Sequence, residues 1–224
     1  MIWFTSDTHF GDEKTLIYRY RPFKNVEEMN DALVKNWNEN VNPNDLVMHL
    51  GDFAVTDEAI EKYASKLNGE IRLIIGNHDE QRDRDLLEKH FTVMDKPHII
   101  RFTYNEKSEK LWVCHYPLQR KNVEYSGIYS CCGHIHDLFK VARKMLNVGV
   151  DVWNFTPISL DVVMKSRQAE LDGHWDANVY PDAPIEWQWK ISNIKKREGN
   201  EPTLNILREK LNKPRKGDEN GYEN

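Results

Sequence analysis

Residues 2–12 read IWFTSDTHFGD, and in this stretch a run of strand-forming residues stops at an aspartate. The same change recurs in LVMHLGDF at 46–53, RLIIGNHD at 72–79, KLWVCHYP at 110–117 and IYSCCGHIH at 128–136. Short apolar runs of this kind predict strands, so five strands are each followed by polar side chains. In an open α/β sheet, the loops at the carboxyl ends of the strands converge on one crevice. The sequence therefore predicts one polar site built from five loops.

Helical patterns separate the first three of these strands. Residues 25–41 carry apolar side chains at helical spacing behind Asn25, an N-cap with Glu28 three positions later as in a capping box. Residues 57–69 show the same spacing and close on Asn68-Gly69, which is typical of a helix C-terminus. The first half of the chain is therefore predicted to be βαβ.

The second half is predicted to be mostly strand. Residues 98–117 have the pattern of a hairpin, and residues 127–132 and 145–150 are expected to form further strands. The last predicted element is a helix over 156–171, with Thr156 as its N-cap and a proline at its first position.

The chain is predicted to form one α/β domain, residues 1–171, followed by a C-terminal extension, residues 172–224. A single domain fits 224 residues, because domains run to roughly 100 to 200 residues. The extension is expected to be partly irregular and mobile at its end. From Lys190 to Lys216 it carries nine Lys or Arg and three acidic residues, a net charge of +6 (9 − 3). Such a segment either contacts phosphate or another anionic partner or is simply solvated.

The composition excludes several classes of protein. With 39% hydrophobic residues, the chain contains no run near the roughly 18 apolar residues of a membrane span, and its start lacks the pattern of a secretory signal. Three cysteines cannot all pair within one chain, so a cytoplasmic location is expected. The net charge of −5 opposes a generally basic, nucleic-acid-binding surface.

The side chains that follow the strands are a mixture of carboxylates, an amide and imidazoles. Such a mixture suits Mn, Fe, Zn or Co better than Ca or Mg, which prefer oxygen ligands alone. Seven ligand residues with one shared carboxylate make eight bonds, which is the number that two four-coordinate ions require. The candidate ligands are Asp7, His9, Asp52, Asn77, His115, His134 and His136, and His78 lies beside them.

In chain order, SDTHFGD, GD, GNHD, CHYP and GHIH resemble the signature of the calcineurin-like metallophosphoesterases. The resemblance spans residues 1 to about 165. The stretches TSDTHFG, RPF and NVGVDVW further resemble a group of small bacterial and phage phosphoesterases in that family. The resemblance implies an α/β fold, a four-layer α/β/β/α sandwich with mixed sheets, and two bound divalent transition metal ions. Mn is favoured, with Fe, Zn, Ni or Co as alternatives.

The resemblance also implies a role for each residue. Asp52 would bridge the two ions, and a water bridging them would attack phosphorus as hydroxide. His78 would protonate the leaving oxygen as a general acid. Asp79, the second candidate catalytic residue, would orient an imidazole or hold the turn. The first ion would take Asp7, His9, Asp52 and His136, and the second Asp52, Asn77, His115 and His134.

Several other residues receive an ordinary structural interpretation. Cys131 and Cys132 are neighbours on a strand and point to opposite faces, so strand packing is favoured over a zinc site. Phe10 and Tyr116 either line the pocket or pack. The histidines without a motif partner are His49, His90, His98 and His174. Three arginines near the motifs, expected to be solvated or to contact substrate phosphate, are Arg21, Arg82 and Arg120.

Three functions remain open. The first is a hydrolase of a small phosphomonoester, phosphodiester or nucleotide. The second is a nuclease or RNA-end-processing enzyme that grips the nucleic-acid backbone with the basic segment 190–216. The third is a non-catalytic scaffold of the same fold, which the complete ligand set and the intact His78 disfavour.

Overall fold

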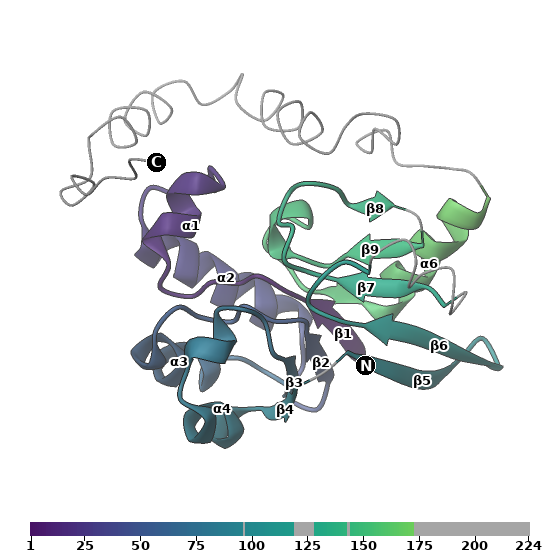
Figure 1. Cartoon of the computed structure of the whole chain (residues 1–224), viewed down its shortest axis with the longest axis horizontal. Helices are drawn as coiled ribbons and strands as arrows, with labels where there is room; N and C mark the ends of the chain where they lie inside the picture. The colour runs from purple at the N-terminus through teal and green to yellow at the C-terminus, as the bar shows by residue number, and fades with distance from the viewer. Residues whose placement is uncertain (96, 119–127, 143, 173–224) are drawn as a thin grey trace, which may run out of the picture.

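The computed structural model describes residues 1–95, 97–118, 128–142 and 144–172. These residues form two five-stranded sheets with helices around them (Figure 1). The strand order is β10-β1-β2-β3-β4 in the first sheet and β5-β6-β7-β9-β8 in the second. Each sheet contains both parallel and antiparallel pairs, so the predicted α/β fold with two mixed sheets is confirmed.

The first sheet is built by alternating strands and helices. Strands β1 to β4 are parallel because a helical connection separates each from the next, whereas β10 joins β1 in the antiparallel direction. The bounds are β1 Ile2–Thr5, α1 Glu13–Tyr18, α2 Val26–Asn40, β2 Leu46–His49, α3 Asp57–Ala64, β3 Glu70–Ile74, α4 Arg84–His90 and β4 Thr92–Met94.

The second sheet starts with the predicted hairpin and continues through short strands. The hairpin strands β5 and β6 are antiparallel, and β6 continues into the parallel series β6, β7 and β9. The bounds are β5 His98–Tyr104, β6 Lys107–Val113, β7 Ser130–Cys132, β8 Val141–Ala142, β9 Met145–Asn147, β10 Ile158–Ser159 and α6 Leu160–Leu171, with 3-10 turns η1 Asp79–Gln81 and η2 Val150–Val152.

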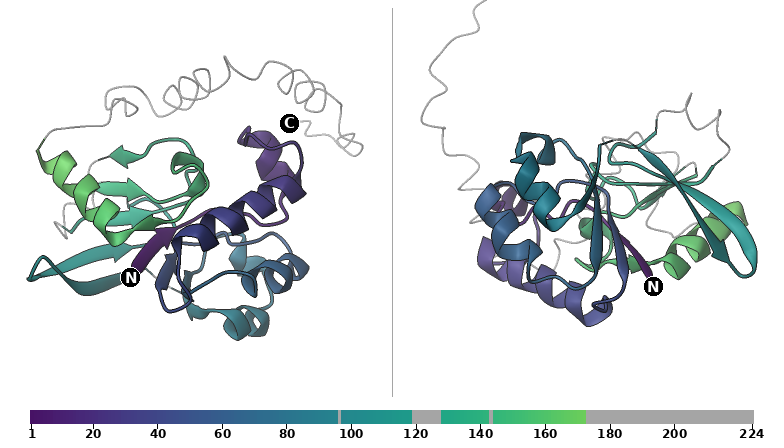
Figure 2. Two further views of the ribbon diagram at one scale, coloured as in Figure 1. Left: turned by 180° about the vertical axis from the view of Figure 1, so that it is seen from behind. Right: turned by 90° about the horizontal axis from the view of Figure 1, so that it is seen from below.

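Two apolar cores flank the first sheet. Successive side chains of a strand point to opposite faces, so Val47 belongs to the core under helices α2 to α4 and Met48 to the core between the sheets. Leu73 and Ile74 divide in the same way. Burial on both faces explains why the parallel strands are continuous apolar runs rather than alternating ones. Views from behind and below show α2 against the first sheet and α6 against the second (Figure 2).

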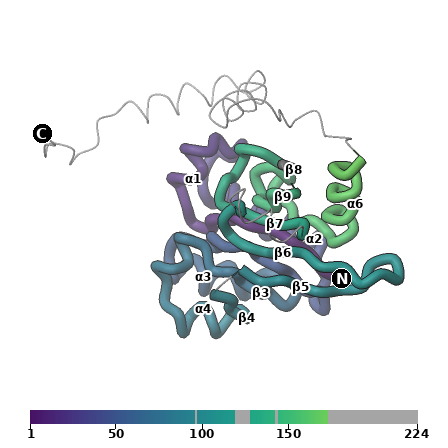
Figure 3. The backbone as a smooth tube through the Cα atoms, turned by 45° about the vertical axis from the view of Figure 1, so that its right-hand side comes forward, coloured from purple at the N-terminus to yellow at the C-terminus, as the bar shows by residue number. Residues whose placement is uncertain are grey.

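Strand polarity brings the polar loops together. The loops after β1, β2 and β3 in one sheet and after β6 and β7 in the other carry side chains that lie close together. The backbone tube shows β3 and β4 of the first sheet below β6, β7 and β9 of the second (Figure 3). Ser6 at the end of β1 pairs with Gly149, which lies beyond β9, and so joins the two sheets at that point.

Helix α3 is shorter than predicted. The sequence pattern suggests a helix that runs to Asn68-Gly69, but α3 ends at Ala64. The Nδ2 of Asn38 donates to the Lys66 carbonyl, and the Nε1 of Trp37 donates to the Asn68 carbonyl. These two hydrogen bonds from side chains of α2 hold residues 66–68 in a turn. The contacts with α2 therefore end the helix earlier than its own sequence pattern predicts. Gly69 has a φ of +95° and serves the entry into β3 instead.

The last helix starts later than predicted. Thr156 was expected to be its N-cap, but α6 starts at Leu160 and Ser159 is the N-cap. The reason is that Ile158 and Ser159 pair with β1 as strand β10, so they cannot be helical. The Thr156 hydroxyl donates to the Asn154 carbonyl instead.

Other predicted boundaries shift or cannot be compared. The strand expected at 145–150 ends at Asn147, and the chain enters η2 at Val150. Helices α1 and α4 were not predicted, because each is only six or seven residues long. Apart from Asp172, the C-terminal extension lies outside the described residues, as do Arg120 and His174. Within the described ranges, no helix is both long and apolar enough for a membrane span.

Replacing the observed cap should destabilise the protein more than replacing the expected one. Ser159→Ala removes the acceptor for the Val162 N–H and should lower the free energy of unfolding by about 1 kcal/mol, whereas Thr156→Ala should change it little. Urea unfolding of both variants measures the difference. A larger loss at Thr156 would contradict the assigned helix start.

Candidate metal centre

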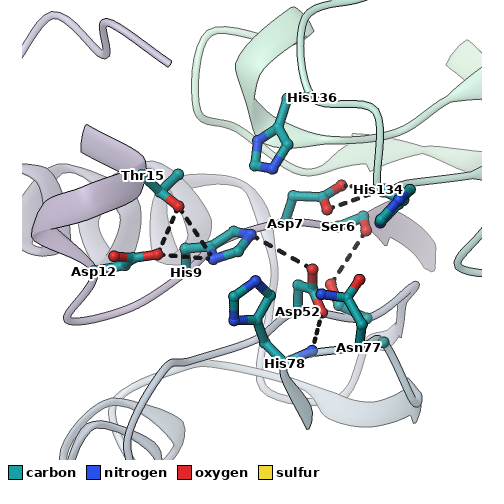
Figure 4. Close-up of polar contacts among 12 residues, drawn as sticks. Ser6, Asp7, His9, Asp12, Thr15, Asp52, Asn77, His78, His134 and His136 are labelled. Carbon is teal, nitrogen blue, oxygen red and sulfur yellow. Dashed lines mark hydrogen bonds and ion pairs between the residues drawn. The ribbon is translucent and has the colours of Figure 1, made fainter. Parts of the chain in front are cut away.

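The five loops that follow β1, β2, β3, β6 and β7 place the candidate ligands in one cluster. Figure 4 shows those of the loops after β1, β2, β3 and β7. Three groups of side chains in the described residues have potential ligand atoms within 4.8 Å of one another. Asp52, which the resemblance implies would bridge the two ions, belongs to two of these groups. The groups are Asp7, His9 and His136; His9, Asp52 and His78; and Asp52, His115 and His134.

The backbone at five of the candidate ligands is left-handed. Their φ values are 57° at Asp7, 51° at His9, 57° at Asp52, 70° at His134 and 50° at His136. A positive φ is uncommon outside glycine and costs of order 1–3 kcal/mol, and such residues concentrate at functional sites. The chain therefore tolerates backbone strain at these five positions, each of which directs a side chain towards the cluster.

Two glycines allow the loops to approach one another. A Cβ on Gly76 would lie 2.3 Å from Oδ1 of Asp52, and one on Gly133 would lie 1.9 Å from Oγ of Ser6. Both contacts are far below van der Waals distance. Any side chain at either position would therefore push the Asp7 or Asp52 loop out of place.

His115 directs its Nε2 atom at the cluster. Its Nδ1 lies 2.7 Å from the carbonyl of Leu50, which only accepts, so Nδ1 carries the proton. Its Nε2 then faces Oδ2 of Asp52 at 3.4 Å and Oδ1 of Asn77 at 3.2 Å. Burial lowers the pKa of His115, but the hydrogen bond with Asp52 and the charges of the nearby carboxylates raise it to about 9. The field at this point favours a positive charge, either a proton or a metal ion.

His9 has the same arrangement on the other side. Its Nδ1 lies 3.3 Å from Oδ2 of Asp12, which also accepts from the Thr15 hydroxyl at 2.6 Å. Its Nε2 is buried, has no hydrogen-bond partner among the described residues and lies 3.6 Å from Oδ2 of Asp52. Burial lowers the pKa of His9. A buried nitrogen without a partner is costly unless a ligand satisfies it, so the residues fit a metal ion.

The carboxylates are held by backbone N–H groups. The His134 N–H donates to both oxygens of Asp7 at 3.0 Å, and the His78 N–H donates to Oδ1 of Asp52 at 2.9 Å. Each carboxylate is thus bound by a neighbouring loop. Oδ2 of Asp52 is left facing the imidazoles of His9 and His115.

Asp79 holds the turn. The side chain is buried and accepts hydrogen bonds from the backbone N–H groups of Asp52 at 2.7 Å, Phe53 at 3.0 Å and Gly76 at 2.9 Å. In the described part of the chain its hydrogen bonds go to backbone and none to an imidazole, which favours the second of its two expected roles. Burial raises the pKa of Asp79 to about 6, although the hydrogen bonds from Gly76 and Phe53 act in the opposite direction.

One side of the cluster is open to solvent. Asn77, His78 and His134 are half-buried, whereas the other candidate ligands are buried. The His78 ring meets His9 edge-on, with centroids 4.8 Å apart. Tyr116 is 49% exposed, and its ring lies 4.5 Å from that of His134, so it borders this opening. Phe10, by contrast, is buried and stacked on Tyr63, so it packs.

His49 is hydrogen-bonded to the loops that carry the first candidate ligands. Its Nδ1 accepts from the Gly51 N–H at 3.3 Å, and its Nε2 is 3.0 Å from the Thr8 hydroxyl, which donates to the Phe53 carbonyl. Burial lowers the pKa of His49 to about 3, so the ring is neutral. The structural interpretation of this residue is borne out, and its contacts show that it ties the first loop to the second.

Arg21 is neither a surface residue nor exposed to substrate, and both expectations were wrong. It is buried and forms a bidentate ion pair with Asp151, whose Oδ2 also lies 2.8 Å from Nδ1 of His136. Burial by itself raises the pKa of Asp151, but the charge of Arg21 and the contact with His136 hold that pKa far below its usual range. Arg21 lies within RPF and Asp151 within NVGVDVW, so the ion pair gives a role to one residue in each of these stretches.

The remaining expectations concern residues outside the cluster. Arg82 lies 3.7 Å from Asp57 at the start of α3, and His90 lies 2.9 Å from Glu61. The three cysteines are free and buried, and Cys131 belongs to the core between the sheets. None of the cysteines is in the three groups of potential ligands in the described residues. The expectation of strand packing is therefore borne out for Cys131.

The chain is similar to several known proteins. Residues 1–157 match the model of the calcineurin-like phosphoesterase superfamily domain. An uncharacterised protein of Methanocaldococcus jannaschii is 35% identical over 174 residues, which are 73% of this chain and 89% of the relative. The Gene 66 protein of Mycobacterium phage L5 is 37% identical over 81 residues, 34% of this chain and 39% of the phage protein.

A solved structure has the same fold. The crystal structure of a protein of unknown function from Aquifex aeolicus superposes with a TM-score of 0.57 at 24% identity. The match covers 74% of this chain and 98% of the Aquifex chain. At this identity the likeness concerns the fold alone.

Replacing Asp79 should loosen the turn. Asp79→Asn can accept with one oxygen only, so at least one of the three buried N–H groups loses its partner, which should cost about 1–3 kcal/mol of unfolding free energy. Urea unfolding measures this, with exposed Glu80→Gln as the matched control. Equal stability of the two variants would contradict the turn-holding role.

Proposed function

The chain belongs to the calcineurin-like phosphoesterase superfamily, and from this premise we propose that it is a dinuclear metal-dependent phosphoester hydrolase. The substrate is a phosphomonoester or a phosphodiester, either a small molecule or a nucleotide. The observation that carries the proposal is the cluster of three potential ligand groups, two of which share Asp52. The Nε2 atoms of His9 and His115 face the Asp52 carboxylate.

Seven side chains would hold two ions, with Asp52 shared. The donor set of carboxylates, imidazoles and one amide suits Mn, with Fe, Zn, Ni or Co as alternatives. Bound there, such ions lower the pKa of coordinated water and neutralise charge on a phosphoryl group. The first ion would take Asp7, His9, Asp52 and His136, and the second Asp52, Asn77, His115 and His134.

His78 is the proposed general acid. Its backbone N–H is fixed to Oδ1 of Asp52, while its imidazole lies half-buried on the open side of the cluster. A histidine in this position can hold a proton at the leaving oxygen of a bound phosphoester. Tyr116 borders the same opening and can contact the organic part of the substrate. The three free cysteines favour a reducing compartment, so we place the protein in the cytoplasm.

Nucleic acid is the second candidate substrate. The feature that favours it is the segment 190–216, with a net charge of +6 (9 − 3) in a chain of net charge −5. A basic segment in a phosphoesterase chain would bind the phosphate backbone without reading its sequence. A non-catalytic scaffold is disfavoured, because it would have no need for His78 or for the complete set of ligands.

Removing the imidazole of His78 should separate binding of the metals from turnover. The Mn²⁺-loaded protein should hydrolyse aryl phosphomonoesters or phosphodiesters, and His78→Ala should lower kcat about 10²- to 10⁴-fold while both ions stay bound. Steady-state kinetics and metal analysis measure the two effects, with His90→Ala as the control, since His90 pairs with Glu61 on the surface.

Each alternative outcome has a meaning. Unchanged turnover would show that the assigned acid is wrong. Loss of an ion would make His78 a ligand, as its grouping with His9 and Asp52 permits. An inactive wild-type protein, across several metals and both substrate classes, would contradict the proposed function itself.

Deleting residues 190–216 tests the nucleic-acid alternative. The deletion should weaken binding to RNA or single-stranded DNA and flatten the dependence of log K on log salt, because fewer counterions are released. Fluorescence anisotropy over a series of salt concentrations measures both, and hydrolysis of a small aryl phosphate serves as the control. Binding that is unaffected by the deletion would remove the reason for this candidate.

A further inference from the structure

The guanidinium of Arg21 has an acceptor for each of its N–H groups. Nε and Nη2 donate to the two carboxylate oxygens of Asp151 at 2.8 and 2.9 Å. Nη2 also donates to the Asp7 carbonyl at 2.6 Å, and Nη1 donates to the Thr8 carbonyl at 2.9 Å and contacts Sδ of Met29 at 3.5 Å. A guanidinium carries five N–H donors, and these contacts use all of them. Arg21 therefore has no donor left for a substrate phosphate.

The same contacts fix the loop after β1. Asp7 and Thr8 belong to that loop, and both of their carbonyls are bound to Arg21. Asp7 has a left-handed φ of 57°, a conformation that costs energy and needs support from its surroundings. The charged hydrogen bonds from Arg21 supply that support, because hydrogen bonds with an ionised partner are stronger than neutral ones.

Asp151 fixes the imidazole of His136. A carboxylate only accepts hydrogen bonds, so the 2.8 Å contact between Oδ2 of Asp151 and Nδ1 of His136 places the proton on Nδ1. The lone pair is then on Nε2, the other ring nitrogen. The His136 ring lies 5.1 Å from that of His9, in the group that contains Asp7.

The other half of the cluster is held by different contacts. The Leu50 carbonyl orients His115, and the Asp79 carboxylate holds the backbone at Asp52. The contacts of Arg21 and Asp151 with the centre go to the Asp7 and Thr8 carbonyls and to the His136 imidazole. The ion pair thus acts on one half of the centre.

We propose that Arg21 and Asp151 are a positioning pair for one of the two ions only, the ion held by Asp7, His9 and His136. This inference rests on the proposed function, because it presupposes that the cluster binds two ions. Neither residue touches substrate. Arg21 sets the backbone that carries Asp7 and His9, and Asp151 selects the tautomer of His136 that can bind the metal.

Asp151→Asn is the decisive variant, because its amide can offer an N–H to Nδ1 of His136 and favour the wrong tautomer. Partners that orient a metal-binding histidine typically change metal affinity about 10- to 100-fold. The effect is measured by equilibrium dialysis with Mn²⁺ and metal analysis in two backgrounds. His134→Ala keeps the Asp7, His9 and His136 group, and His9→Ala keeps the Asp52, His115 and His134 group.

In the His134→Ala background, Asp151→Asn should weaken Mn²⁺ binding about 10- to 100-fold, whereas in the His9→Ala background it should leave binding unchanged. Asp45→Asn is the matched control. Asp45 is similarly buried and accepts hydrogen bonds from the Trp3 indole and the Asn42 N–H, but it precedes β2 at the other end of the sheet. It should lower stability without changing Mn²⁺ affinity in either background.

The variants also separate this inference from the function that it rests on. Equal weakening in both backgrounds, or none in either, would overturn the positioning role although the wild-type protein binds two Mn²⁺. Failure of the wild-type protein to bind Mn²⁺ would instead contradict the proposed function. If Asp151→Asn does not fold, Arg21→Lys keeps the charge, loses the bidentate contact and should produce the same difference between backgrounds.

Nitrogen-15 NMR of the metal-free wild-type imidazoles tests the step through His136 directly. The His136 resonances should report a proton on Nδ1, and in Asp151→Asn the proton should move towards Nε2. A wild-type His136 protonated on Nε2 alone would overturn the inference, whatever the stability of the variants. A loss of packing alone would not move this signal.

Discussion

The structure depends on two carboxylates, Asp7 and Asp52, buried where the two sheets meet. A buried charge is expensive unless hydrogen bonds or an opposite charge compensate it. Loops from other strands supply the hydrogen bonds, through the N–H of His134 to Asp7 and the N–H of His78 to Asp52. The Nε2 atoms of His9 and His115 both face Asp52, and the proton of each neutral ring is held at Nδ1 by an acceptor on the other side. A bound cation would compensate the remaining negative charge, and the fold holds the carboxylates and imidazoles in position for one.

Backbone strain is the cost of delivering ligands from tight loops. Five of the eleven non-glycine residues with positive φ in the described chain are candidate ligands. Hydrogen bonds between the loops offset this strain: the Asp7 N–H donates to the Gly51 carbonyl at 3.0 Å, and the His9 N–H donates to the Asp52 carbonyl at 3.1 Å. The first two loops therefore stabilise each other. Their shared geometry explains why glycine is needed at Gly51, where a Cβ would lie 2.5 Å from Nδ1 of His115.

Sequence patterns predicted the sheets and the cluster well, because both depend on local order. An apolar run followed by a polar residue marks a strand end, and parallel strands bring their ends together, so the convergence of Asp7, Asp52 and His115 needed no tertiary information. The end of α3 and the start of α6 could not be found in the same way. Asparagine and tryptophan side chains of α2 decide the first, and the pairing of β10 with β1 decides the second. Those partners are distant in the sequence and carry no local signal.

Arg21 shows most clearly what sequence patterns could not predict. A single arginine near a phosphoesterase motif has a solvated and a phosphate-binding interpretation, and both treat its charge as available. The structure neutralises that charge with Asp151, 130 positions away, and then uses the same carboxylate to orient His136. A buried ion pair is not by itself a reason for stability, since apolar residues of similar size often serve as well. The presence of the ion pair is better explained by its effect on His136. A carboxylate beside an imidazole fixes which ring nitrogen carries the proton and which faces the cluster, and no apolar pair can do that. The two halves of the centre thus depend on different interactions, one on the Arg21–Asp151 ion pair and the other on the Leu50 carbonyl and the Asp79 carboxylate.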